Sequence, residues 1–421
     1  MTEDAQTHVV VVGGGFAGVA CARTLASNKD VRVTLVDQND YHQFQPLLYQ
    51  VATSMLAARD IAFPLRKIAE EYAGFTAKRG EVVSLDPVAW SVTTSTGETY
   101  AGDYVVLAAG SRPHFFGTPG AEHAFPLYSL DDADRLRTRI VQAFEEADRD
   151  PGLVDEGAID FVIVGGGPTG VEVAGALSEM IHTTILHEFP ELAPRATVRL
   201  VDHGTALLRM FADKGHAYAA GILEKDGVKL LLGKSVKAIG PGHVTLTDGT
   251  TIKTRCVIWG GGLMAAPIAG ASGLPQGRGG RIDVATDFTV AGFPGILVIG
   301  DIANIPAKDG KTHPQLGSVA LQSGSAAART ILADVAKRPA KPFSYLDKGT
   351  MAMIGRGAAV AQVKGVELHG RMAFAAWLGV HAALMTGRSN RVDAFKSWAQ
   401  DYFGKDRAPQ ALDRSGTPRM V

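Results

Sequence analysis

Short uninterrupted apolar runs alternate along the chain with longer stretches of helical spacing. Two such runs lie at residues 9–12 and 161–164, and each is followed by a second strand pattern, at residues 31–36 and 198–201, in which Val and Leu are interrupted by Arg or Thr. Runs of this kind are typical of strands buried on both faces of a parallel sheet. A helix is predicted within each pair, at residues 19–26 and after Gly170. The order strand, helix, strand therefore occurs twice, which predicts an α/β protein with two similar dinucleotide-type units.

Weaker strand patterns follow each pair and extend the duplication. Residues 80–86, 92–94 and 104–107 predict a small β meander that returns to the main sheet, closed by Ala108-Ala109-Gly110. In the second half, residues 228–232, 244–246 and 256–259 predict its counterpart, closed by Gly260-Gly261-Gly262. An amphipathic helix at residues 129–147 is expected to link the units, because its apolar residues recur at helical spacing.

Length and composition narrow the class of protein. A chain of 421 residues is expected to hold two or three domains. With 42 Lys+Arg against 43 Asp+Glu, it lacks the concentrated basic field of a nucleic-acid-binding protein. The start of the chain is polar and does not read as a secretory signal. No window reaches the roughly 18 continuous apolar residues of a spanning helix, so any contact with a membrane is expected at its surface.

The cysteines exclude several kinds of redox chemistry. Cys21 and Cys256 are the only two, with no disulfide framework, no C-x-x-C pair and no zinc spacing. That usage favours a reducing, cytosolic compartment. Cys21 falls in the first predicted helix and Cys256 in a predicted strand of the other unit, so both are expected in the core. Flavoenzymes that reduce disulfides or oxidise sulfide through a cysteine pair are therefore disfavoured.

A glycine fingerprint connects strand to helix in both units. Gly13, Gly15 and Gly18 form the first G-x-G-x-x-G loop, and Gly165, Gly167 and Gly170 form the second. A lone match is often only a tight turn, but strand, loop, helix and second strand in register indicate a dinucleotide site. Each following strand ends in an acid, Asp37 or Asp202, placed to bind ribose hydroxyls. No arginine directly follows Asp202, which favours NADH over NADPH, although His203 weakens this slightly.

Glu172 allows two interpretations. Pro168 suits the first helical position, which puts Glu172 about one turn into the helix. A carboxylate there can simply interact with the helix dipole, worth about 0.3–1 kcal/mol. However, the same helix end is expected to face a pyrophosphate, so a second anion nearby is unfavourable unless it has another task. We therefore favour a catalytic role for Glu172.

Two further segments suggest a ligand. Residues 295–301 form a short aliphatic strand that ends in Gly300-Asp301, and open α/β sheets bind ligands at such strand ends. A turn aspartate is the alternative. Residues 40–53 mix aromatics, two glutamines and Pro46, and this loop fits either a packed connection or a lid over a flat ring.

Taken together, the chain resembles the two-dinucleotide flavoprotein reductases, and more narrowly the type II, non-proton-pumping NADH:quinone oxidoreductases. The resemblance covers nearly the whole chain and rests on residues 42–50, on Pro168-Thr169-Gly170-Val171-Glu172 and on Gly300-Asp301. It implies that NADH passes hydride to FAD, which then passes two electrons to a membrane quinone.

The resemblance also implies a set of binding residues. The FAD contacts would be Gly13, Gly15, Phe16, Ala17, Gly18, Asp37, Gln38, Gln45, Val82, Ala109, Gly110, Asp301, Ser318 and Val319. The NADH contacts would be Gly165, Gly167, Pro168, Thr169, Gly170, Asp202 and Gly261. Quinone would meet Gln45 and Gln322. The family usually has an Ala-Gln pair four residues before the position of Gln322, and Ser318 stands there instead, which puts the details of quinone contact in doubt.

The domain layout and the C-terminal end follow from the same resemblance. It implies FAD binding by residues 1–115 and 287–341, NADH binding by 116–286, and membrane-surface contact and dimerisation by 342–421. An apolar stretch with basic residues close behind suits an interfacial helix on the inner face of the cell membrane. Its residues are Phe374, Trp377, Leu378, Val380, Leu384 and Met385, followed by Arg388, Arg391 and Lys396. A helix packed on its own sheet or on a partner subunit is the alternative.

Two other functions stay open. One is a soluble NADH-dependent flavoprotein reductase that acts on a dye, a peroxide or a redox protein. The other is a flavin-bound redox sensor that uses NADH only to change shape. The sequence counts mildly against a sensor, because both predicted ring-facing loops are intact.

Overall fold

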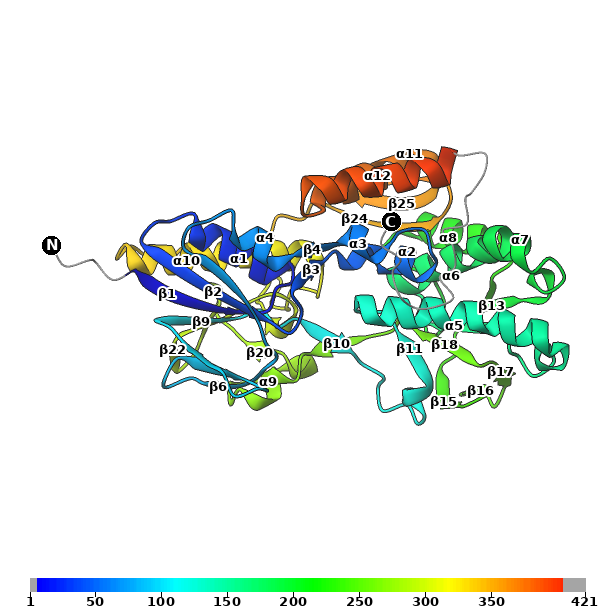
Figure 1. The fold of residues 1–421 in the computed structure, drawn as a ribbon, viewed down its shortest axis with the longest axis horizontal. Coiled ribbons are helices and arrows are strands. Elements are labelled where there is room, and N and C mark those ends of the chain that lie inside the picture. Colours follow the sequence, from blue (N-terminus) through cyan, green and yellow to red (C-terminus); the bar gives the residue numbers. More distant parts are fainter. Residues whose placement is uncertain (1–5, 404–421) are drawn as a thin grey trace. The chain divides into compact units, whose positions relative to one another are not determined.

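The computed structural model describes residues 6–403 (Figure 1). The first five residues and residues 404–421, which end the predicted C-terminal region, lie outside the described range. Within that range the chain divides into two compact units. Unit 1 comprises residues 6–43, 62–112 and 263–347, and unit 2 comprises residues 44–61, 113–262 and 348–403.

Unit 1 is built on a six-stranded sheet in the order β21-β22-β9-β1-β2-β5. All neighbours pair in parallel except β21 and β22. Its strands are β1 (Thr7–Val12), β2 (Val31–Asp37), β5 (Phe75–Arg79), β9 (Tyr104–Leu107), β21 (Thr289–Val290) and β22 (Phe293–Val298). The valines of β1 are buried, as the continuous apolar run predicts for a central strand.

Two helices of unit 1 pack closely on each other. They are α1 (Phe16–Ala26) and α10 (Gly317–Val335). A Cβ on Gly324 would collide with the Ala17 carbonyl, so only glycine lets α10 approach α1 so closely. Two strands of the predicted meander are present as β6 (Val82–Asp86) and β7 (Ser91–Thr94), but its third strand is β8 (Thr99–Ala101), and residues 104–107 form β9 of the main sheet. Smaller elements are β3 (Tyr41–Gln43), β4 (Ala62–Pro64), α4 (Leu65–Ala69), α9 (Ile268–Ala271), β20 (Ile282–Asp283) and β23 (Ala303–Asn304).

Unit 2 contains a five-stranded parallel sheet in the order β11-β18-β12-β13-β14. The strands are β11 (Ala124–Pro126), β12 (Asp160–Val164), β13 (Thr197–Asp202), β14 (Lys229–Leu232) and β18 (Cys256–Trp259). Its longer helices are α5 (Leu130–Arg149), α6 (Pro168–Met180) and α8 (Asp213–Lys225). A capping box starts α5, because the Ser129 and Asp132 side chains each accept the other residue's backbone N–H.

The prediction for the second meander was wrong in two of its strands. Residues 228–232 and 256–259 belong to the parallel sheet as β14 and β18, and β18 is buried along its whole length. The meander itself consists of β15 (Val236–Gly240), β16 (His243–Leu246) and β17 (Thr251–Lys253). The error arose because a short apolar run fits a buried parallel strand as well as a meander strand.

The rest of unit 2 joins the C-terminal segment to residues 44–61. An antiparallel sheet of β24 (Thr350–Gly355), β25 (Ala358–Val363) and β26 (Val366–His369) precedes α11 (Gly370–Leu384) and α12 (Arg388–Phe403). The short helices α2 (Leu48–Ala52) and α3 (Ala58–Ile61) complete this part. Trp377 and Met385 are buried in the unit, which corrects their expected place on an interfacial face. None of the described helices is both long and apolar enough to cross a membrane.

Candidate active site

The first glycine loop is held by the acid that ends β2. The Gly14 N–H donates to Oδ2 of Asp37 at 2.6 Å, and the Asn39 N–H donates to Oδ1 at 2.7 Å. Burial raises the pKa of Asp37 above its usual value, against these two N–H donors. No described atom lies within 4 Å of a Cβ built on Gly15, so the backbone is open where a pyrophosphate is expected.

The second loop repeats this arrangement. The Gly166 N–H donates to Oδ2 of Asp202 at 2.6 Å, and the Gly204 N–H donates to Oδ1 at 2.7 Å. Around Gly167, too, no described atom lies within 4 Å of an added Cβ. In each loop a Cβ on the last glycine, Gly18 or Gly170, would collide with the carbonyl of the first. Both loops therefore fit a dinucleotide pyrophosphate at a helix N-terminus.

The other predicted NADH residues surround the second loop. Pro168 is the first residue of α6, Thr169 is exposed and Gly170 is buried. Gly261 follows β18, and its carbonyl accepts the Trp259 indole N–H at 2.5 Å.

Asp301 lies in the turn after β22, in unit 1. Burial raises the pKa of Asp301 to about 6, although the Ser111 hydroxyl donates to its Oδ2 at 3.3 Å. The Gln315 side-chain N–H donates to the Asp301 backbone carbonyl at 3.1 Å. This half-buried acceptor fits a contact with hydroxyl groups such as those of a flavin ribityl chain.

The remaining flavin candidates of unit 1 lie in several environments. Phe16 opens α1 and meets the buried His42 edge-to-face, with ring centroids 5.3 Å apart. Ala109 and Gly110 are half-buried after β9, and Ala17 is buried in α1. Gln38 is exposed, and Val82 is half-buried at the start of β6. Among these residues, the surroundings of Gln38 and Val82 give the least support to a predicted contact with FAD.

Hydrogen bonds hold both Ser318 and Gln322 at the start of α10. The Ser318 hydroxyl is hydrogen-bonded to the Tyr345 hydroxyl at 2.8 Å, and Val319 is buried. The Gln322 amide is held from both ends by Leu346: its N–H donates to the carbonyl at 2.9 Å, and its oxygen accepts the backbone N–H at 3.0 Å. Ser318 is thus paired with Tyr345, and the predicted quinone residue Gln322 is paired with the next residue, Leu346.

Gln45 belongs to unit 2, where its side-chain N–H donates to the Tyr128 carbonyl at 3.4 Å. The two predicted quinone residues, Gln45 and Gln322, thus fall in different units, and each is anchored within its own.

Glu172 is the fifth residue of α6, because the helix starts at Pro168. It lies beyond the first turn, where interaction with the helix dipole fades. Burial raises the pKa of Glu172 to about 8, and the Met353 N–H, which donates to Oε1 at 3.3 Å, opposes the shift. A carboxyl with a pKa of about 8 keeps its proton at neutral pH.

Comparison with known proteins agrees with this geometry. Residues 7–324 match the family of pyridine nucleotide-disulphide oxidoreductases. The type II NADH:quinone oxidoreductase NdhA of Mycobacterium tuberculosis is 36% identical to this chain, over 96% of this chain and 89% of that protein. A type II NADH:quinone oxidoreductase of Staphylococcus saprophyticus is 26% identical, over 89% of this chain and 93% of that protein. The chain belongs to the type II NADH:quinone oxidoreductase family.

Solved structures show the same fold. NDH2 from Plasmodium falciparum, in complex with NADH, matches with a TM-score of 0.88 at 17% identity, over 95% of this chain and 99% of that one. The sulfide:quinone oxidoreductase of Aquifex aeolicus matches with a TM-score of 0.72 at 18% identity, over 95% and 96%. The predicted fold class and family are thus confirmed, and FAD and NADH are the cofactors of this type II enzyme.

The cysteines separate this type II enzyme from thiol-dependent members of the wider family. Cys21 and Cys256 are both fully buried, and burial raises the pKa of each thiol to about 12. Neither is therefore available as a thiolate nucleophile at neutral pH. The core placement predicted for both is confirmed.

Several residues around the site carried no signal in the sequence. Tyr345 pairs with Ser318, and the bond from His42 Nδ1–H to the Gly14 carbonyl, at 2.8 Å, joins two segments that sequence patterns did not connect. Met353 meets Glu172 across 181 positions of the chain. Local patterns cannot reveal such pairs, because they form only when distant segments fold together.

Proposed function

We infer that this chain is an FAD-dependent, non-electrogenic NADH:quinone oxidoreductase. The observation that carries this function is the pair of matching loops, each with an open glycine at a helix N-terminus and an aspartate that holds the turn. Two such loops serve two dinucleotides, and the family supplies the reaction. When bound, FAD accepts a hydride from NADH and passes two electrons to a quinone.

We assign FAD binding to residues of unit 1 and NADH binding to residues of unit 2. In unit 1, Gly13, Gly15, Gly18 and Asp37 would hold the FAD pyrophosphate and ribose, with Asp301 at the ribityl chain. In unit 2, the second loop and Asp202 would hold NADH. Both oxygens of Asp202 already hold backbone N–H groups, and a carboxylate can still accept further bonds from ribose hydroxyls. A 2′-phosphate would bring negative charge beside this carboxylate, which supports NADH over NADPH.

Glu172 would act at the proton step. Quinone reduction takes up two protons as well as two electrons, and a carboxyl that keeps its proton at neutral pH is suited to supply one. The Glu172 carboxyl would give up this proton, while the Met353 N–H on Oε1 stabilises the carboxylate that remains.

The other assignments are proposals of the same kind. Gln45 and Gln322 would contact quinone, with Ser318 and Val319 against the flavin. The FAD-binding domain would comprise residues 1–115 and 287–341, the NADH-binding domain residues 116–286, and the membrane-surface and dimer region residues 342–421.

Membrane contact rests on one set of exposed side chains in α11 and α12. Met372, Val380, Leu384, Val392 and Phe395 expose between 40% and 68% of their surface. Exposed apolar residues beside Arg391 and Lys396 suit peripheral binding to an anionic lipid surface. We place the enzyme at the inner face of the cell membrane, as a homodimer.

The function is tested by following the flavin. Protein purified with its own flavin is reduced with NADH without oxygen, and a quinone is then added. The visible flavin absorbance should bleach and then return, with about one NADH consumed per quinone reduced. A flavin that NADH reduces but quinone does not reoxidise would favour a sensor or a reductase of another acceptor.

A further inference from the structure

A buried chain of hydrogen bonds joins α12 to strand β24 within unit 2. The Trp398 indole N–H donates to Oε1 of Gln50 at 2.8 Å, and the Gln50 amide donates to the Tyr49 hydroxyl at 3.0 Å. The Tyr49 hydroxyl donates to the Met353 sulfur at 3.5 Å. All four side chains are buried, so these polar groups are shielded from water.

Met353 connects this series of hydrogen bonds to Glu172. Its sulfur accepts a hydrogen bond from the Tyr49 hydroxyl, and its backbone N–H donates to Oε1 of Glu172. Strand β24 is an edge strand of its sheet, so one side of its backbone is free of strand pairing and can face α6.

The spacing between α6 and β24 is tight. A Cβ on Gly175 would collide with the Ile354 carbonyl, so α6 touches the β24 backbone directly at this point. Glu172 and Gly175 lie three residues apart and thus on one helix face. A small shift of β24 must therefore change the distance between the Met353 N–H and the Glu172 carboxyl.

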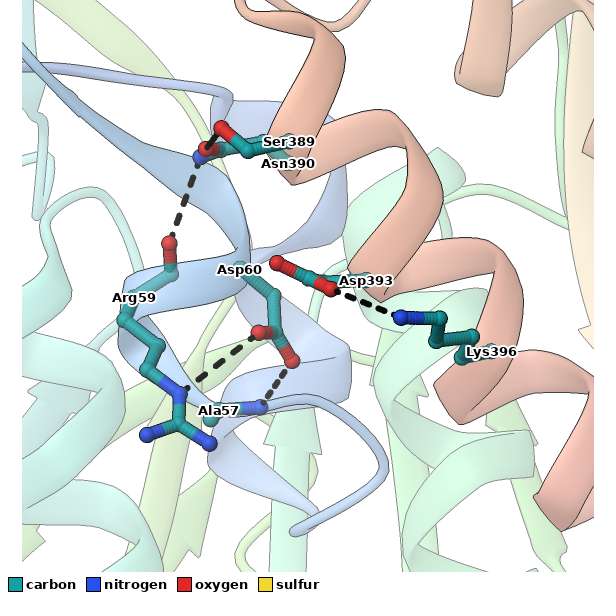
Figure 2. A network of polar contacts seen from close by, with 7 residues as sticks. All are labelled: Ala57, Arg59, Asp60, Ser389, Asn390, Asp393 and Lys396. Carbon is teal, nitrogen blue, oxygen red and sulfur yellow. Dashed lines mark hydrogen bonds and ion pairs between the residues drawn. The ribbon is translucent and has the colours of Figure 1, made fainter. Parts of the chain in front are cut away.

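Helix α12, which carries Trp398, lies at the other end of this series of hydrogen bonds. The Asn390 amide donates to the Arg59 carbonyl at 3.2 Å, and the nearby Asp60 carboxylate accepts the Ala57 N–H at 3.0 Å (Figure 2). Ala394 and Trp398 are buried and one turn apart, whereas Phe395 is 65% exposed. One face of α12 is thus docked on residues 44–61 of the same unit, and its place sets the position of the Trp398 N–H.

We propose that Tyr49, Gln50 and Trp398 are positioning residues, which transmit the docking of α12 to the Met353 N–H and so to the Glu172 carboxyl. The proposal rests on the catalytic role of Glu172 inferred above. Without the Trp398 N–H, the buried Gln50 oxygen loses its donor and the amide reorients. The Gln50 amide then no longer holds the Tyr49 hydroxyl against the Met353 sulfur, and β24 shifts relative to α6.

The direction in which the pKa of Glu172 should move follows from its hydrogen bond with the Met353 N–H. The Met353 N–H favours the ionised carboxylate, so its loss raises the pKa of Glu172 further above about 8. Among the described residues, no charged group of α2, α8, β12, β13 or β24 contributes to this shift. The titratable neighbours along the path are Tyr49, from α2, and His381, from α11, and burial lowers the pKa of His381 to about 4, so it is neutral there.

The fold supplies a matched control. Trp377 is fully buried beside Tyr49 and Trp398, and its indole N–H has no hydrogen-bond partner within the described part of the chain. Trp398→Phe and Trp377→Phe remove the same atoms from the same aromatic cluster. Of these two variants, only Trp398→Phe breaks the series of hydrogen bonds. A third variant, Tyr49→Phe, breaks it by the loss of a single oxygen.

The test is an infrared pH titration of the flavin-loaded protein. The protonated carboxyl band of Glu172 is assigned by its loss in Glu172→Gln. Trp398→Phe and Tyr49→Phe should each raise the midpoint by about half to one pH unit, while Trp377→Phe leaves it in place. Equal shifts in Trp398→Phe and Trp377→Phe, or no shift with Tyr49→Phe, would overturn the coupling.

Failure of the coupling can be told from failure of the function. If Glu172→Gln stops quinone turnover but the midpoint does not move in Tyr49→Phe, the coupling is wrong and the enzyme assignment stands. If the midpoint moves but Glu172→Gln keeps full turnover, the positioning chain is real and the catalytic role of Glu172 is wrong.

Discussion

The Gly166 N–H donates to the carboxylate of Asp202 at 2.6 Å, so the residue that ends β13 also fixes the turn that follows β12. Asp37 does the same for Gly14 in unit 1. The acid of each fingerprint therefore has a structural task as well as its expected contact with a ribose. Replacement of either acid should disturb the loop even before a dinucleotide binds.

Asp202→Ala should weaken NADH binding selectively. The Gly166 and Gly204 N–H groups lose their acceptor, and an unsatisfied buried donor costs about 1–3 kcal/mol. We expect the KM for NADH to rise about tenfold or more, because about 1.4 kcal/mol corresponds to a factor of ten. The flavin content should stay unchanged. Asp248→Ala, in the exposed turn after β16, is the control. An unchanged KM for NADH in Asp202→Ala would contradict the assignment of this loop.

Glu172→Gln should change how stability depends on pH. The folded pKa of about 8 lies above the ordinary 4.5, so the folded protein holds this proton more tightly than the unfolded chain. The stabilisation is complete below about pH 4.5 and is lost as pH rises to about 8. Urea unfolding across this window should show the parent protein losing stability relative to Glu172→Gln. The exposed Glu191→Gln should parallel the parent at every pH.

Gly175→Ala should destabilise unit 2 by overpacking. The added methyl group meets the Ile354 carbonyl, and such strain typically costs about 1–3 kcal/mol. Gly221→Ala is the matched control, because it also lies in a helix and no described atom comes within 4 Å of its added Cβ. There alanine should stabilise the protein by about 0.5–1 kcal/mol. Thermal melting measures both, and similar melting temperatures for the two variants would refute the tight α6–β24 contact.

Membrane binding should depend on the exposed face of α11 and α12. Met372→Ser with Phe395→Ser removes two side chains that are 68% and 65% exposed. Buried large apolar side chains contribute about 1.5–3 kcal/mol each, so co-sedimentation with anionic vesicles should fall at least about tenfold. Val88→Ser changes a residue that is 88% exposed in unit 1 and should bind vesicles like the parent. If the double variant bound vesicles as well as the parent does, a membrane-binding role for this face would be contradicted.

The sequence was most informative where the signal is local. A continuous β-branched run predicted β1, because a strand buried on both faces needs apolar residues at every position. The glycine spacing and the terminal acids predicted both loops, because the tight turn, the open backbone and the acid each demand particular residue types. The family resemblance came from the same segments and from residues 42–50.

The sequence was least informative where distant segments meet. Nothing near Glu172 in the chain indicates Met353, 181 residues away, and nothing near Gln50 indicates Trp398. The apolar stretch around Trp377 favoured a membrane-surface helix, with a packed helix as the alternative. The structure places Trp377 in the core and leaves Met372 of the same helix exposed.

In the proposed reaction, NADH reduces the flavin and the reduced flavin passes its electrons to a quinone. The most direct measurement is the steady-state rate of NADH oxidation by the flavin-loaded enzyme with a membrane quinone, compared with the rate when oxygen is the only acceptor. We expect quinone to raise the rate far above the oxidase rate, and Glu172→Gln to remove most of that gain. A quinone rate no higher than the oxidase rate would contradict it.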